Sequence, residues 1–111
     1  MIQARLRPLA EADLTDQARY SHSVAGDDVA QRFFNAAIAS LEAAQQMPRI
    51  GSARIGELSG IPGLRVRRID GFPCGWYYFI HHDHHDHHDV VRLLADSRDL
   101  TAILNSLDPP A

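Results

Sequence analysis

The residues best suited to chemistry form a tract of histidine and aspartate at positions 81–89. The tripeptide His-His-Asp occurs there three times in tandem. Imidazole and carboxylate groups are good ligands for zinc, nickel and copper. A functional site also needs ligands held in fixed geometry by surrounding contacts, which a hairpin tip lacks. We therefore expect no resident metal or other cofactor, with a metal site as the alternative. The candidate ligands are His81, His82, His84, His85, His87 and His88.

Arginines form the second candidate group. All eleven basic residues of the chain are arginine, and fourteen acids give a net charge of −3. Arginine holds carboxylate and phosphate groups but stays protonated, so it is a poor general base. A basic cluster on a mildly acidic protein fits an acidic partner, whereas the net charge argues against a nucleic-acid coat protein. The candidate partner-binding residues are Arg65, Arg67, Arg68, Arg92 and Arg98.

Length and composition describe an ordinary globular protein. We expect residues 1–111, of which 45% are hydrophobic, to form a single domain. No apolar run reaches the roughly 18–20 residues that span a bilayer, and the N-terminus lacks the apolar block of a signal peptide. Cys74 is the only cysteine, so an intrachain disulfide is excluded and a cytoplasmic location is expected. No membrane partner is expected either.

Hydrophobic periodicity predicts two helices in the first half of the chain. Residues 3–7 alternate as a short strand, and Pro8 suits the first turn of a helix that runs to about residue 23. A Gly-Asp-Asp sequence then ends this helix and is expected to cap the next one. From 29 to 46, apolar residues recur at three- and four-residue intervals, which predicts one broad apolar face. We expect both Phe33 and Phe34 in the core.

The second half predicts strands and a final helix. Glycine and proline make residues 47–63 an irregular connector. A last helix is expected to be capped at residue 96 or 97. Strand composition is found at 64–70, 75–81 and 89–95.

This order of elements predicts an α+β fold. It has an N-terminal strand, a helical hairpin, a three-stranded antiparallel meander and a short C-terminal helix. If the first strand joins the sheet, the helical hairpin is the long connection back to it. Alternation along the last strand places Arg92 on the face opposite Val91 and Leu93, where it would bind a partner or face solvent.

Several segments occur together in the order and spacing of a known family. They are 7–14, Tyr20, the helix around Phe33 and Phe34, the proline–glycine step at 48–51, 63–65, 76–80, 90–94 and 97–100. In this order they resemble the ParE/RelE superfamily of toxins from bacterial type II toxin–antitoxin modules, and the ParE branch in particular. The resemblance implies the RelE/ParE-like fold. Departures are Asp96, where the family often has histidine, and the longer hairpin tip.

The resemblance implies a toxin that is neutralised by a ParD-like antitoxin encoded beside it. In this family the C-terminal segment of the antitoxin wraps around the toxin. ParE-like members mostly poison DNA gyrase, whereas RelE-like members cut messenger RNA on the ribosome. The resemblance leaves a homodimer and a toxin–antitoxin heterotetramer both open.

The residues themselves bear on the choice between these activities. RNA cleavage needs a general base, cations at the phosphate and an acid for the leaving oxygen. The chain has no lysine, and its C-terminal residues carry no tyrosine or histidine, which leaves Tyr77, Tyr78 and His88 as possible acid–base groups. We therefore expect a non-enzymatic toxin that acts by protein–protein binding. The alternatives are a ribosome-dependent endoribonuclease and a metal-binding accessory module.

Overall fold

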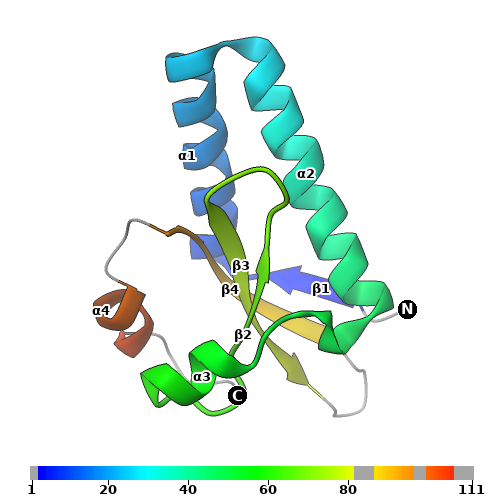
Figure 1. The fold of residues 1–111 in the computed structure, drawn as a ribbon, viewed down its shortest axis with the longest axis vertical. Helices are drawn as coiled ribbons and strands as arrows, with labels where there is room; N and C mark the ends of the chain where they lie inside the picture. The colour runs from blue at the N-terminus through cyan, green and yellow to red at the C-terminus, as the bar shows by residue number, and fades with distance from the viewer. Residues whose placement is uncertain (1–2, 82–86, 97–99, 107–111) are drawn as a thin grey trace.

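A computed structural model describes residues 3–81, 87–96 and 100–106 (Figure 1). The four strands form one mixed sheet in the order β1–β4–β3–β2, in which β1 runs parallel to β4 and the other neighbours are antiparallel. The helical hairpin carries the chain from β1 to β2 at the opposite edge, and the α+β prediction is confirmed. The elements are β1 (Gln3–Leu6), α1 (Pro8–Ala25), α2 (Asp27–Gln46), η1 (Pro48–Ile50), α3 (Arg54–Ser59), β2 (Arg65–Arg68), β3 (Cys74–His81), β4 (His87–Ala95) and α4 (Leu100–Asn105).

The sheet separates two hydrophobic clusters. On one face, α1 and α2 cover a cluster that includes Phe33, Ala37, Trp76, Tyr78 and Leu93. On the other face, α3 and α4 lie over a cluster that includes Leu64, Tyr77, Phe79, Val91, Leu94 and Leu104. The tip of the α1–α2 hairpin projects past the sheet, beside the turn that joins β2 to β3 (Figure 1). No helix in the described part of the chain has the length and apolar character that a membrane span requires.

The boundary between α1 and α2 depends on Gly26. Its φ of 86° is a conformation that favours glycine, and it ends α1 and serves as the N-cap of α2. The Gly-Asp-Asp sequence thus ends one helix and begins the next, with Gly26 as the N-cap and Asp27 in the first turn of α2, although no side chain makes a capping hydrogen bond. The predicted apolar face of α2 is confirmed at Phe33, but Phe34 is 43% exposed rather than in the core.

Two further local features differ from the sequence predictions. The connector at 47–63 contains η1 and α3, because Gly56 lets α3 lie directly against the backbone of Ile61 and Leu64. The strand β4 begins at His87, so the histidine–aspartate tract is not all loop.

A β-bulge in β4 breaks the predicted alternation. Tyr77 pairs with Arg92 and Tyr78 pairs with Val90, so the intervening Val91 is an extra residue. Val91 packs in the cluster on the α3 side and Leu93 in the cluster on the α1 side. The prediction that Val91 and Leu93 share one face is therefore wrong.

Candidate functional site

An open apolar groove lies between the α1–α2 hairpin and the β2–β3 turn. Its volume is about 530 Å³, and its lining includes Tyr20, Val24, Phe33, Phe72 and Cys74. The groove exists because the hairpin tip projects past the sheet and leaves its inner face above the turn (Figure 1). Phe33 and Phe72 meet edge to face, with ring centroids 5.2 Å apart. We refer to this feature as the hairpin groove.

The rim of the hairpin groove is apolar and open to solvent. The side chains of Tyr20 and Val24, one turn apart on α1, are 63% and 62% exposed. Cys74 is buried, and that burial raises the pKa of its thiol to about 11, so it stays protonated at neutral pH. Asp96 is the acidic residue of the lining, and it is paired with Arg68. The groove therefore suits an apolar side chain of a partner rather than a reaction.

Two of the predicted arginines are held by aspartates of the same chain. The Arg68 guanidinium donates to both carboxylate oxygens of Asp96, and this pair raises the pKa of Arg68. Arg92 donates from Nε and Nη2 to Asp13 on α1, at 2.7 and 3.0 Å, which raises the pKa of Arg92. Asp13 also accepts the backbone N–H of Leu93 at 3.0 Å. Arg92 is half-buried beside α1 rather than free on an open sheet face.

Two other predicted arginines lie on β2 without such a partner. Arg65 donates from Nη1 to the carbonyl oxygen of Gly51 at 2.7 Å. The closest carboxylate to Arg67 among the described residues is Asp70, at 3.9 Å. Arg98 lies outside the described residues. The structure thus sorts these four arginines into two that donate hydrogen bonds to an aspartate and two that do not.

The ends of the histidine–aspartate tract belong to β3 and β4. The rings of His81 and His87 stack across the strands with centroids 4.7 Å apart, and His81 Nε2 lies 3.4 Å from Asp89. Arg7 donates to both oxygens of that carboxylate, at 2.9 and 2.7 Å. Within residues 3–81, 87–96 and 100–106, no three histidine, cysteine or acidic side chains are arranged to hold a metal ion. His82, His84 and His85 lie outside the described residues.

The candidate acid–base groups lie in the interior. Tyr77, Tyr78 and His88 are all buried, and the ring of His88 packs against that of Tyr78 with centroids 4.9 Å apart. Burial is the main cause that raises the pKa of both tyrosines. These three groups do not meet at a surface where a phosphodiester could reach them.

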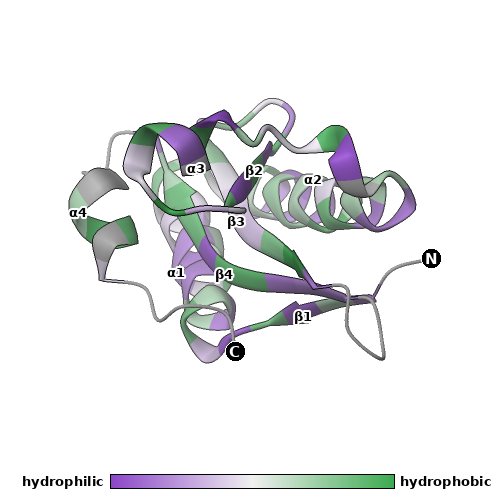
Figure 2. Cartoon of the chain, turned by 90° about the horizontal axis from the view of Figure 1, so that it is seen from below, coloured by the Kyte–Doolittle hydropathy of each residue, from purple (hydrophilic) through white to green (hydrophobic). Residues whose placement is uncertain are grey.

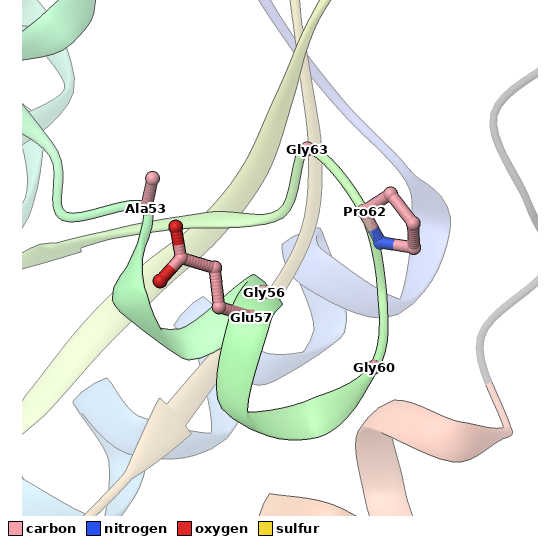
Figure 3. A pocket seen from close by; sticks show the side chains of 6 residues that line it. All are labelled: Ala53, Gly56, Glu57, Gly60, Pro62 and Gly63. Atoms are coloured by element: carbon pink, nitrogen blue, oxygen red, sulfur yellow. The ribbon is translucent and has the colours of Figure 1, made fainter.

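A second hollow, of about 320 Å³, lies between α3 and the turn that leads to β2 (Figure 3). Glycine forms much of its wall, and its one ionisable side chain is Glu57. Glycine is required at these positions by the local structure rather than by a ligand. A Cβ on Gly56 would lie 2.7 Å from two backbone oxygens, and Gly60 ends α3 with a φ of 71°. A single carboxylate and packing glycines do not make a catalytic site.

Sequence reasoning missed the rim residues of the hairpin groove and the aspartates that pair with arginine. Nothing in the sequence marks Tyr20 as an exposed rim residue, and Val24 lies beyond the predicted end of the first helix. A helix carried on to Gly26 would have placed Tyr20 and Val24 on one face, four residues apart. Asp13 and Asp96 carry no such signal, because they lie 79 and 28 residues from their arginines.

Comparisons with known proteins identify the family. The family model described as ParE toxin of type II toxin–antitoxin system, parDE, matches residues 4–100. No curated protein matches the chain. Among solved structures, the fold is similar to a chain from the chromosomal ParDE toxin–antitoxin system of P. aeruginosa, with a TM-score of 0.70 and 18% sequence identity. That likeness covers 86% of this chain and 96% of the other. The chain therefore belongs to the ParE toxin family of type II toxin–antitoxin systems.

Proposed function

We propose that this protein is a toxin that acts in the cytoplasm by binding other proteins, with DNA gyrase as its target and a ParD-like antitoxin as its inhibitor. The hairpin groove carries this proposal. It offers an apolar floor with exposed Tyr20 and Val24 at its rim, which is the kind of surface that receives the apolar face of an amphipathic helix.

The arginines extend this binding surface beyond the groove. Of the predicted partner contacts Arg65, Arg67, Arg68, Arg92 and Arg98, we propose Arg65 and Arg67 as the direct ones, because they lack a close carboxylate in the described part of the chain. Arg68 and Arg92 are instead held by Asp96 and Asp13 of the same chain. An antitoxin segment that pairs apolar and acidic residues would match both features. Such a wrapped complex can exist as one toxin with one antitoxin or as a heterotetramer, and light scattering on the purified complex distinguishes these from a toxin homodimer.

The interior position of Tyr77, Tyr78 and His88 favours a binding mechanism over RNA cleavage. A general acid or base must lie within hydrogen-bond reach of the proton that it transfers. These three side chains are buried in the sheet, and burial raises the pKa of both tyrosines. An endoribonuclease would need other side chains as its general acid and base.

Expression in bacteria with and without the adjacent antitoxin gene tests the proposal. Expression of the toxin alone should arrest growth, and co-expression of the antitoxin should restore it. Purified toxin should inhibit gyrase in a DNA supercoiling assay. Harmless expression together with failure to bind the antitoxin would exclude the toxin function. New codon-linked ends on cellular messages, detected by primer extension, would replace gyrase poisoning with RNA cleavage.

A further inference from the structure

The arginines in the described part of the chain that are partly buried or bonded to an aspartate fall into two kinds. Arg7, Arg68 and Arg92 each donate two hydrogen bonds to one aspartate, which is the geometry that neutralises a guanidinium most completely. Arg65 and Arg67 are partly buried, yet neither has a carboxylate within hydrogen-bond distance among the described residues. The difference singles out these two cations.

Arg67 is the clearer case. Its side chain is only 22% exposed, and its closest carboxylate, on Asp70, is 87% exposed and 3.9 Å away. The Nε atom of Arg67 is buried and has no hydrogen-bond partner within the described residues. Buried charges in proteins are ordinarily paired, and buried donors are ordinarily bonded. Arg67 therefore has unused capacity to bind an anion.

Arg65 lies beside Arg67 on the same face of β2. Arg65 pairs with Tyr78 and Arg67 with Trp76 on β3, so the two guanidinium-bearing side chains are next neighbours on one side of the sheet. The positive charge of each lowers the pKa of the same Tyr78 hydroxyl, although burial raises that pKa overall. The guanidinium groups of Arg65 and Arg67 thus both lie near the Tyr78 hydroxyl.

This region lies at the edge of the sheet. β2 is the outer strand next to β3, and its residues are largely hydrophilic (Figure 2). The backbone N–H and C=O of Val66 are already bonded to Ser52, at 3.0 and 2.9 Å. A partner at this edge would therefore be recognised by the arginine side chains rather than by addition of a strand at Val66.

We propose that Arg65 and Arg67 form a receiving site for an acidic side chain of the antitoxin. The proposal rests on the proposed function, because it assumes the antitoxin complex. A carboxylate fits the planar fork of a guanidinium in the way that Asp13 and Asp96 fit theirs. The net charge of −3 favours a protein carboxylate over the phosphates of a nucleic acid as its source.

Arg67→Met and Arg68→Met provide a matched pair of variants. Methionine keeps the apolar stem and removes the cation at two successive positions, one without a close carboxylate and one already paired. Arg67→Met should weaken antitoxin binding by about tenfold or more, as expected for the loss of a hydrogen bond between charged groups, and should reduce the salt dependence of binding. Its Tm should equal or exceed that of the wild type. Arg68→Met should leave the affinity within about twofold and lower the Tm.

Calorimetry with the purified antitoxin and thermal unfolding of the free toxin supply both readouts. Arg67→Lys keeps the charge but not the planar fork, so its affinity for the antitoxin should lie between those of the wild type and Arg67→Met. It takes the place of Arg67→Met in the comparison if that variant does not fold. Unchanged affinity in the Arg67 variants, or a Tm loss equal to that of Arg68→Met, would overturn the proposal. Binding of an oligonucleotide is measured in the same way. If Arg67→Met lost oligonucleotide binding but kept its affinity for the antitoxin, the ligand of this site would be a phosphate and the proposal would be overturned. Absence of any wild-type complex would instead reject the proposed function.

Discussion

At the scale of single residues, Asp13 joins the helical layer to the sheet. It accepts two hydrogen bonds from Arg92 and one from the backbone of Leu93, and both side chains of the ion pair are mostly shielded from solvent. Leu93 lies beyond the end of β1, so Asp13 supplies an acceptor to an edge of β4 that β1 does not cover. The α1 helix thus completes the hydrogen bonding of this strand.

Replacement of Asp13 by alanine should lower the free energy of unfolding by about 2–3 kcal/mol, because it leaves a shielded guanidinium and a backbone donor without their acceptor. Urea denaturation measures the change. Asp16→Ala is the matched control, since Asp16 lies exposed on the same helix, and it should cost less than about 0.5 kcal/mol. Equal effects of the two substitutions would show that the Asp13 network does not stabilise the fold.

Asp89 gives the stability a defined dependence on pH. Burial of Asp89 pushes its pKa up, but the hydrogen bonds and charge of Arg7 together with His81 outweigh this effect, so its pKa lies below the ordinary 3.8. A carboxyl whose pKa is lowered by folding stabilises the protein above its unfolded pKa, and that contribution disappears as the pH falls through the folded pKa.

Asp89→Asn should therefore be less stable than the wild type at pH 6, and the difference should shrink below about pH 4. Denaturation curves collected from pH 6 to pH 3 measure this convergence. A constant difference between Asp89→Asn and the wild type across the range would contradict the assignment.

The arginines show what sequence can predict at this scale. Composition and spacing identified Arg65, Arg67, Arg68 and Arg92 as candidates. They could not tell which of these arginines are bonded to an aspartate and which are not. Pairing depends on aspartates 28 and 79 residues away, which only the fold brings near. The prediction of partner binding at these residues stays a prediction.

At the scale of elements, α3 depends on one close approach. A Cβ on Gly56 would lie 2.7 Å from the backbone oxygens of both Ile61 and Leu64, and backbone cannot move aside as a flexible side chain can. Gly56→Ala should therefore lower the free energy of unfolding by about 1–3 kcal/mol, as overpacking does. Glu57→Ala, at the next and exposed position of α3, should change it by less than about 0.5 kcal/mol. Chemical denaturation compares the two variants, and a neutral Gly56→Ala would mean that α3 packs differently.

Elements with a regular hydrophobic period were predictable, and those that depend on tertiary contacts were not. The recurrence of Phe33, Ala37 and Leu41 predicted α2 correctly, because a long helix repeats its signal over several turns. The helix α3 is only six residues long and has too few turns to show a period. The bulge at Val91 has no signal in the sequence, because apolar residues stand on both sides of Arg92 and pack on both faces of the sheet.

At the scale of the whole molecule, the fold separates stability from binding. The two clusters on the faces of the sheet bury most of the large side chains, whereas Tyr20 and Val24 stay exposed at the rim of the hairpin groove. Exposed apolar side chains around a hollow are typical of a protein-binding surface. The family resemblance predicted such a partner, but it could not locate the groove, because the groove is formed by segments as distant as α1 and the β2–β3 turn.

Tyr20→Asp combined with Val24→Asp should abolish antitoxin neutralisation while leaving the fold intact. Both side chains are largely exposed, so the Tm of the free toxin should change little, whereas a charge placed at each rim position would be desolvated under a bound apolar helix. Leu58→Asp is the matched control, because Leu58 is 72% exposed on α3 and is not among the residues that line the groove. Pull-down with the antitoxin and growth rescue by its co-expression should fail for the double variant and succeed for Leu58→Asp. Full neutralisation of the double variant would place the antitoxin on a surface other than the hairpin groove.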